Sequence, residues 1–304
     1  MKRIGVYYRD HDRTPLLYLI REMAARFEDL EVPIEWVPGH VEYTEGFLAG
    51  KLDLICEHLQ FLFPARAQGH PIRCLAACQN RSVEEMLAAK GVETVRDLRG
   101  KTVAIRSISS SRMTALQWLR YLGLEESVRV LEVSDEEVGR WAQWRRITEG
   151  VADAVICSPL YREPALAAGL HVVEAPPLPQ VGSLYFAALG PFVDEHDDEL
   201  RSFTRALYRA LHAFHHDPKL TLKVMSGEPA RLMGISDQAE LRRSYEFMRD
   251  SYEERPLPRL DALAQTYDML RRHVGGIDGL NPLTLWDLRY VLELEEQGFM
   301  RLSS

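Results

Sequence analysis

Residues 95–105 read VRDLRGKTVAI and are followed at 106–112 by RSISSSR. The stretch combines a charged turn, an apolar run of the kind found in β-strands, and a serine-rich loop. Apolar residues then recur at helical spacing, as Met113, Leu116 and Leu119, so we predict a strand, a loop and a helix. A strand that delivers hydroxyl groups and backbone N–H groups to a helix N-terminus can hold an anion or a polar ligand.

Strand and helix patterns alternate on both sides of this stretch. Before residue 84 we expect strands at 4–8, 32–37, 52–56 and 72–78, with helices at 15–27, 43–49 and 61–68. Later strands are expected at 86–89, 102–105, 128–133, 154–157, 170–174 and 184–189. From residue 197 onward the pattern is mostly helical and closes on a long helical pattern from 281 to 294. Such alternation is typical of βαβ units and a largely parallel sheet.

Composition and charge narrow the class of protein. The chain has 304 residues, of which 46% are hydrophobic and 27% charged, and its formal net charge is −8. These values fit a globular protein with two lobes of ordinary domain size. The acidic balance argues against a nucleic-acid partner, whose binding surface would be basic. A local pocket can still be positive on an acidic protein, so an anionic small ligand stays open.

The N-terminus and the cysteines bear on the cellular compartment. The apolar run from Ile4 to Tyr8 is short and meets the charged segment RDHDR at 9–13, which does not resemble a secretory signal. We therefore expect a cytoplasmic protein without membrane insertion, or a periplasmic or extracellular one if a leader has been removed. The four cysteines lack zinc-site spacing and the histidines are scattered, so we expect buried free thiols, no metal and no cofactor.

Three further segments extend the pattern of residues 95–105: GFLAGKLDLI at 46–55, TEGVADAVI at 148–156 and LTLWDLRYVLELEEQGF at 283–299. Together they resemble type II periplasmic binding protein-like proteins. The resemblance is to the nitrate/sulfonate/thiamine-precursor branch of the ABC transporter substrate-binding proteins and to related cytoplasmic enzymes. It implies an α/β fold of two lobes, each a mainly parallel sheet flanked by helices, with a ligand cleft between them. Residues 1–84 and 185–304 would form lobe 1, with the C-terminal helices, and residues 85–184 would form lobe 2.

Ligands of open α/β sheets bind beyond the carboxyl ends of the strands. The residues at the ends of the predicted strands are therefore our candidate ligand contacts: Tyr8, Arg9, His11, Glu57, His58, Arg106, Ser107, Ser109, Ser110, Ser111, Ser158 and Tyr161. The serines could instead cap the following helix without meeting any ligand. Arg106 could clamp a carboxylate or sulfonate through two parallel hydrogen bonds. The segment at 9–13 also fits a solvated charged loop.

The sequence Cys56-Glu57-His58 places a thiol, a carboxylate and an imidazole at the end of one predicted strand. These groups could supply a nucleophile and a general base, so Cys56 and His58 are our candidate catalytic residues. A histidine at a ligand site can equally serve only as a hydrogen-bonding group. The residues alone leave both alternatives open.

The resemblance includes both binding proteins and enzymes. Its cytoplasmic enzymes are thiamine-pyrimidine synthases, decarboxylases of dihydroxyphthalate and the biphenyl sulfinate desulfinase. This chain has Asp10-His11 where the desulfinase has its nucleophilic cysteine, and it lacks the cysteine-rich motif of the pyrimidine synthases. We therefore expect first a binding protein for a small anionic or aromatic organic ligand. It would be a monomer or dimer, with an ABC permease as partner if it is exported. The alternative is a cytoplasmic lyase or hydrolase of the same fold that uses His58 with Cys56 or Arg106. It would be decarboxylase- or desulfinase-like, or related to the thiamine-pyrimidine synthases.

Overall fold

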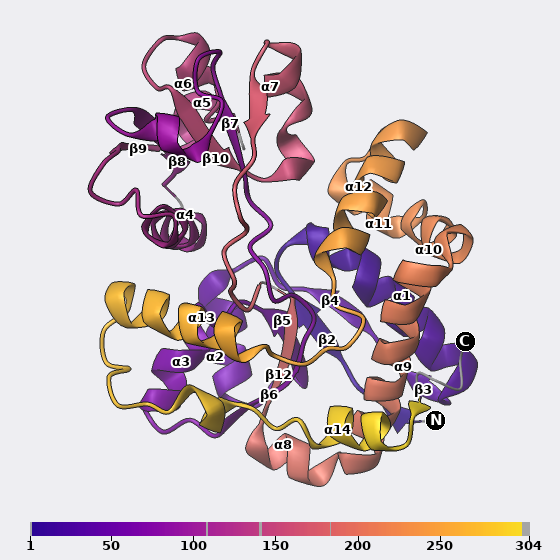
Figure 1. Cartoon of the computed structure of the whole chain (residues 1–304). Coiled ribbons are helices and arrows are strands. Elements are labelled where there is room, and N and C mark those ends of the chain that lie inside the picture. Colours follow the sequence, from indigo (N-terminus) through magenta and orange to yellow (C-terminus); the bar gives the residue numbers. More distant parts are fainter. Residues whose placement is uncertain (1, 108, 140–141, 183, 300–304) are drawn as a thin grey trace. The chain divides into compact units, whose positions relative to one another are not determined.

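The computed structural model describes residues 2–107, 109–139, 142–182 and 184–299. The chain divides into two compact units, which we treat separately (Figure 1). Unit 1 comprises Met1–Asn80 and Val181–Ser304, and unit 2 comprises Arg81–Gln180. The chain passes between the units near residues 80 and 180, slightly before the boundaries that we placed at 84 and 184.

Unit 1 is built on a five-stranded sheet in the order β4-β2-β5-β12-β6. Its strands are β2 (Val6–Tyr8), β4 (Ile34–Trp36), β5 (Leu54–Glu57), β6 (Ile72–Ala77) and β12 (Tyr185–Leu189). β12 runs antiparallel to both of its neighbours, whereas β2 pairs in parallel with β4 and β5. A separate ladder joins β1 (Lys2–Arg3) to β3 (Leu30–Glu31). The sheet is therefore mixed rather than wholly parallel, because β12 enters unit 1 at the edge where the other strands end.

The helices of unit 1 come from both of its chain segments. They are α1 (Thr14–Phe27), α2 (His40–Leu48), α3 (Leu59–Ala67), α8 (Gly190–Glu195), α9 (Asp197–His216), α10 (Pro218–Met225), α11 (Glu228–Met233), α12 (Gln238–Ser251), α13 (Leu260–His273) and α14 (Arg289–Glu296). Short 3₁₀ turns are η1 (His11–Arg13) and η4 (Pro282–Leu285). The main core packs α1 and α9 against the sheet through residues such as Leu16, Ile20, Phe186 and Phe203. The predicted helical pattern at 281–294 is divided between η4 and α14.

Unit 2 has a second five-stranded sheet in the order β11-β7-β10-β8-β9. Its strands are β7 (Glu85–Ala88), β8 (Thr102–Arg106), β9 (Arg129–Val133), β10 (Ala154–Cys157) and β11 (His171–Val173). Its helices are α4 (Ser109–Tyr121), α5 (Asp135–Val138), α6 (Arg145–Thr148) and α7 (Glu163–Ala167), with 3₁₀ turns η2 (Val95–Leu98) and η3 (Pro159–Tyr161). β7 enters from unit 1 and runs antiparallel to β10 and β11. One core contains Trp118 and Leu119 of α4, and the other contains Val138, Ile147 and Ala165.

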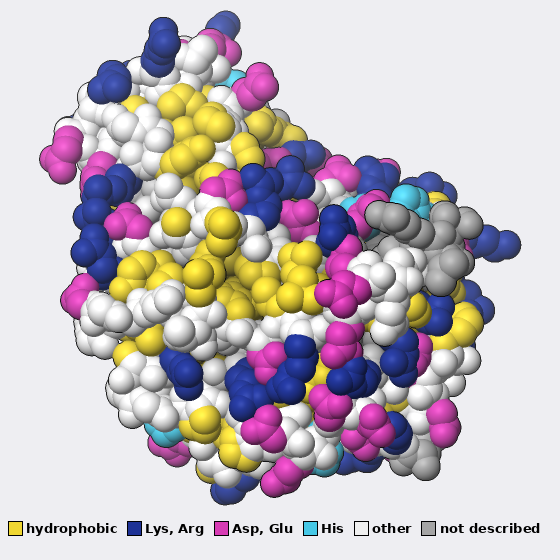
Figure 2. Space-filling model, turned by 60° about the horizontal axis from the view of Figure 1, so that its bottom comes forward, with side chains coloured by type: hydrophobic (Ala, Val, Ile, Leu, Met, Phe, Trp, Pro, Cys, Tyr) yellow, Lys and Arg dark blue, Asp and Glu magenta, His cyan; other side chains and the backbone are white. Residues whose placement is uncertain are grey.

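The surface carries charges of both signs. On the face drawn in Figure 2, basic and acidic side chains are interspersed around apolar areas. That face, among the residues drawn in colour, lacks the continuous basic surface that a nucleic-acid backbone would require. Among the described helices, none combines the length and apolar composition needed to cross a membrane.

Candidate functional site

One edge of the unit 1 sheet gathers the ends of several strands. Tyr185, the first residue of β12, pairs with Glu57 at the end of β5 and with Ala77 at the end of β6. Tyr8 at the end of β2 pairs with both Cys56 and Trp36. We call the side chains at this edge the strand-end site: Arg9, Asp10, His11, Asp12, Arg13, Trp36, Glu57 and His58. Tyr8 itself is 2% exposed and packs into the core beneath the site.

Arg13 is the central cation of the strand-end site. Its side chain is 2% exposed, and its Nη1 donates hydrogen bonds to Asp10 Oδ2 at 3.0 Å and Asp12 Oδ1 at 3.1 Å. Its Nη2 lies 3.7 Å from Glu57 Oε1. Desolvation is the largest effect on the pKa of Arg13 and lowers it, but the three carboxylates together hold this pKa above the ordinary value. The cluster therefore keeps the buried charge of Arg13. Asp10 and Asp12 stay about half exposed, so the segment 9–13 is solvated only in part.

Glu57 is held on several sides. Its Oε1 accepts a hydrogen bond from the backbone N–H of His58 at 2.9 Å, and its Oε2 lies 3.8 Å from Arg9 Nη1. The same Arg9 nitrogen is 2.7 Å from His40 Nδ1 at the start of α2. Within the described part of the chain, Glu57 Oε2 and the buried hydroxyl of Tyr185 make no hydrogen bond. Arg9 Nε, a donor of the same cluster, likewise makes no hydrogen bond among the described residues. Buried polar atoms normally find a partner, so these atoms are candidate contacts for a ligand group.

His58 is a neutral imidazole in this setting. Burial lowers the pKa of His58 to about 4, and the nearby positive charge of Arg13 is the second largest cause of this decrease. A neutral imidazole can donate a hydrogen bond from one ring nitrogen and accept one at the other. Proton transfer near neutral pH is most efficient when the pKa lies near the working pH. These properties favour a hydrogen-bonding role for His58 over general acid–base catalysis.

Cys56 has no exposed surface and lies in β5 between β2 and β12. Burial is the main cause that raises the pKa of its thiol to about 12. Because the thiolate is the nucleophilic form, a buried and protonated thiol reacts poorly. Cys74, Cys78 and Cys157 are also buried free cysteines. The geometry favours a packing role for Cys56.

An aromatic surface adjoins the charged cluster. The rings of His11 and Trp36 lie 4.8 Å apart, and Trp36 Nε1 donates to the carbonyl oxygen of Arg9 at 2.9 Å. Trp36 is 51% exposed, although it is anchored at one end by this hydrogen bond. An anchored and exposed indole can stack on an aromatic ligand. Our sequence reasoning missed Trp36, although its position at the end of a predicted strand was an available signal.

Two arginines of unit 2, Arg106 at the end of β8 and Arg162 after η3, already have carboxylate partners. Arg106 Nε donates to Asp135 Oδ1 at 2.9 Å and its Nη2 also contacts this carboxylate, which further accepts from Gln143 Nε2 at 2.8 Å. Arg162 Nη1 lies 2.6 Å from Glu85 Oε1. An external anion at Arg106 would therefore compete with Asp135. The acidic run at the start of α5 was the signal for this pairing.

The predicted serine loop is the first turn of a helix. α4 begins at Ser109, so Ser110 and Ser111 are helical residues rather than part of a free loop. The Ser107 amide donates to the Val133 carbonyl at 3.1 Å and so continues the hydrogen bonding between β8 and β9. Ser158 is 8% exposed and precedes η3. The side chains of Ser109 and Tyr161 lie outside the described part of the structure.

No group of three or more His, Cys, Asp or Glu side chains in the described ranges could hold a metal ion. The strand-end site therefore offers hydrogen bonds, paired charges and an aromatic face. These groups are suited to recognition of an organic molecule.

Comparisons with known proteins support the architecture. The family model described as NMT1/THI5 like matches residues 26–220. A sulfonate-binding protein SsuA from Methylobacillus flagellatus has a TM-score of 0.71 at 16% identity, covering 98% of this chain and 95% of that one. The aliphatic sulphonate binding protein SsuA from Escherichia coli has a TM-score of 0.65 at 17% identity, with 90% and 86% covered.

An enzyme shares the same fold. The desulfurization enzyme DSZB has a TM-score of 0.63 at 12% identity, with 98% of this chain and 100% of that one covered. A search of curated proteins gave no match. The predicted periplasmic binding protein-like α/β fold is thus confirmed, with one antiparallel strand in each five-stranded sheet.

Proposed function

Because the chain belongs to the NMT1/THI5-like family, we propose that it binds a small organic molecule at the strand-end site of unit 1. The observation that carries the proposal is the cluster of the buried Arg13 and Glu57 with the half-buried His58, at the sheet edge where open α/β folds bind ligands. The cluster is held rigidly by its own ion pairs, so its polar atoms are arranged before a ligand arrives. Sulfonate binding by proteins of the same fold supports small-molecule binding in general.

The charges of the site favour an aromatic ligand over a simple anion. Two arginines, Arg9 and Arg13, face three carboxylates, so the cluster has no surplus positive charge. An anion would meet the Glu57 carboxylate, whose Oε2 instead can accept a hydrogen bond from a ligand N–H or O–H group. Trp36 offers the face on which an aromatic ring can stack. We therefore propose an uncharged or cationic aromatic ligand that carries hydrogen-bond donors.

Binding without chemistry is the function that these groups support best. Neither the pKa of about 4 at His58 nor the pKa of about 12 at Cys56 suits proton transfer or nucleophilic attack near neutral pH. The only support that remains for the lyase alternative is the similarity of this chain to enzymes of the same fold.

Native mass spectrometry of the purified protein for a co-purified small molecule, followed by calorimetry, tests the proposal. Candidate ligands are a panel of aromatic amines and nitrogen heterocycles, with alkanesulfonates of similar size as the matched set. Glu57→Gln and Trp36→Ala should each weaken binding of the aromatic ligand about tenfold, because one loses a charged acceptor and the other the stacking face. Tight binding of an alkanesulfonate that is unaffected by either variant would overturn the proposed ligand class.

The mode of action has a further part that we also propose. If the protein is exported it would deliver its ligand to an ABC permease. A gene adjacent to those of a permease and an ATPase would support delivery, whereas a gene within a catabolic or biosynthetic operon would favour a cytoplasmic role.

A further inference from the structure

A groove on unit 1 lies between helices α10 and α12 and shares no residue with the strand-end site. Its volume is about 490 Å³. Leu222 and Leu241 contribute its apolar lining, and Lys219, Lys223 and Arg242 line it with exposed cationic side chains. Among the described residues, no carboxylate lines this groove. It therefore combines an apolar floor with a basic rim.

The cations of the groove differ from their neighbours. On α11, Arg231 pairs with Glu228, and near the end of α12 Arg249 pairs with Asp250. Within the described ranges, by contrast, Lys219, Lys223 and Arg242 have no ion pair or side-chain hydrogen bond. This arrangement occurs on a chain whose formal net charge is −8. The groove is thus a local reversal of the overall charge and is complementary to an acidic partner.

We propose that the groove docks an acidic amphipathic helix of a partner protein. Lys219 and Lys223 are one helical turn apart on α10, which matches two carboxylates spaced i, i+4 on a facing helix. Arg242 on α12 contacts a carboxylate at the other side of the groove, and the partly exposed Leu222 receives an apolar side chain between the charged contacts. The eight residues of α10 span about 12 Å, or roughly two turns of such a helix.

Other occupants fit less of this surface. A small monoanion can pair with only part of a set of cations that are spread over a helical turn and across the groove. A polyanion without apolar side chains satisfies the cations but leaves Leu222 without a contact. Only a partner with carboxylates and apolar side chains on one face uses both features.

The test uses fluorescence anisotropy with the full chain and a fluorescein-labelled synthetic helical peptide that carries Glu pairs at i, i+4 and Leu residues on the same face. The triple variant K219E/K223E/R242E should weaken binding about tenfold or more, because each contact changes from attraction to repulsion. The variant K51E/K90E/R129E changes the net charge equally at exposed positions outside the groove. It should retain affinity within about twofold.

Two outcomes would overturn the proposal. Equal loss in both triple variants would mean that binding depends only on net charge, and equal affinity for a peptide with Leu replaced by Ser would mean a nonspecific polyanion surface. The milder variant K219A/K223A, which should weaken binding severalfold, serves as a check if charge reversal disturbs folding. Ligand binding at the strand-end site is measured in parallel and should not change, so the two proposals fail independently.

Discussion

Arg13 has the most demanding environment of any single residue at the strand-end site. It immediately precedes α1 and turns inward beneath Asp10 and Asp12, where it also approaches Glu57. If the Arg13 guanidinium were removed, the carboxylates of Asp10, Asp12 and Glu57 would repel one another without a cation between them. The stability of this edge of the sheet and its capacity to present Glu57 therefore depend on the same side chain.

Arg13→Met should lower the free energy of unfolding by roughly 3–5 kcal/mol, because it leaves the buried Glu57 carboxylate without its buried cationic partner. Urea denaturation measures this change. The control is Arg26→Met, which removes an exposed i, i+4 pair with Glu22 and should cost less than about 1 kcal/mol. Similar losses in the two variants would show that the buried cluster contributes little.

His58 should make stability depend on pH in an acidic window. Its pKa is about 4 in the folded chain and near 6.5 when exposed, so the unfolded chain binds more protons between these values. Stability from this residue is complete above pH 6.5 and is lost as the pH falls towards 4. Between pH 7 and pH 4.5 the free energy of unfolding of the native chain should fall by about 2 kcal/mol more than that of His58→Asn. Parallel pH profiles of the two proteins would contradict the depressed pKa of His58.

For single residues, the sequence predicted which side chains lie at the strand ends better than it predicted their burial and their charged partners. Arg9, Glu57 and His58 could be named because each follows an apolar run that ends a strand. The burial of Arg13 could not, since it depends on carboxylates from β5 and from η1 that come together only in the folded chain. The pairing of Arg106 with Asp135, by contrast, had a signal in the acidic run at the start of α5, although the two residues are 29 positions apart in sequence.

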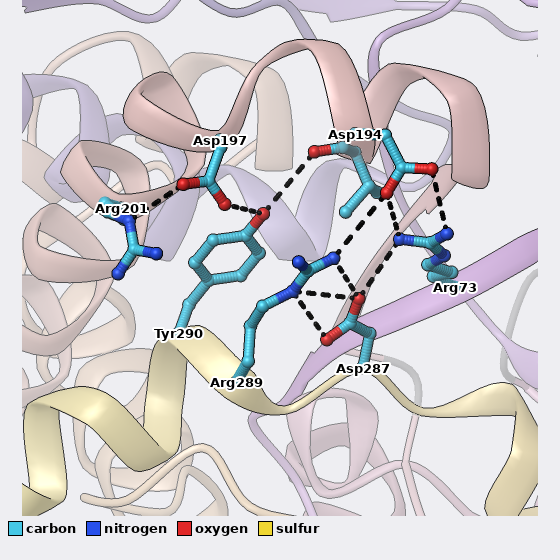
Figure 3. A network of polar contacts seen from close by, with 8 residues as sticks. Arg73, Asp194, Asp197, Arg201, Asp287, Arg289 and Tyr290 are labelled. Carbon is cyan, nitrogen blue, oxygen red and sulfur yellow. Dashed lines mark hydrogen bonds and ion pairs between the residues drawn. The ribbon is translucent and has the colours of Figure 1, made fainter.

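Among the elements, the C-terminal segment is fixed to unit 1 by a polar network (Figure 3). Arg73 of β6 donates to both oxygens of Asp194 in α8, at 2.7 and 3.0 Å, and lies 3.4 Å from Asp287. The Asp287 amide donates to the carbonyl of Cys74 at 2.9 Å, so the chain runs extended beside β6 at this point. This contact explains why the helical periodicity at 281–294 does not give one continuous helix.

Tyr290→Phe should destabilise this attachment of α14. The hydroxyl of Tyr290 donates to Asp197 Oδ1 at 3.0 Å, and the residue is 1% exposed. Loss of a hydrogen bond to a charged group should reduce the free energy of unfolding by roughly 1.5–3 kcal/mol. Asp197→Asn keeps an acceptor oxygen and should cost less than Tyr290→Phe in the same urea titration. A change of under about 0.5 kcal/mol in Tyr290→Phe would argue that the bond adds nothing to stability.

Most elements could be predicted from the sequence because their apolar periodicity is strong, as in α1 and β8. The start of α4 was placed too late, since serines favour helix caps and loops but here occupy the first turn itself. The direction of β7 and β12 could not be read from local patterns. It follows from where the chain crosses between the units, which is a property of the topology.

At the scale of the whole molecule, each unit has its own sheet and its own core. Unit 2 is continuous in sequence, and its two ends are joined by a β-bridge between Arg81 and Pro179. Helix α4 packs against its sheet in one core, and helices α5 to α7 pack against the sheet in the other core. Close ends, a contiguous chain and a packed core are the properties of a domain that can fold by itself.

The excised segment 81–180 should therefore fold without the remainder of the chain and unfold cooperatively in urea. Trp118, which is 2% exposed and donates to the Pro176 carbonyl at 2.8 Å, reports on the core through its fluorescence. Leu119→Ala removes a side chain that is 1% exposed and should shift the transition by about 2–5 kcal/mol, as expected for a packed core. Leu122→Ala changes a partly exposed leucine in the turn that directly follows α4 and should have a smaller effect. A broad transition that Leu119→Ala leaves unchanged would mean that unit 2 does not pack without the rest of the chain. The prediction that segment 81–180 folds by itself would then be wrong.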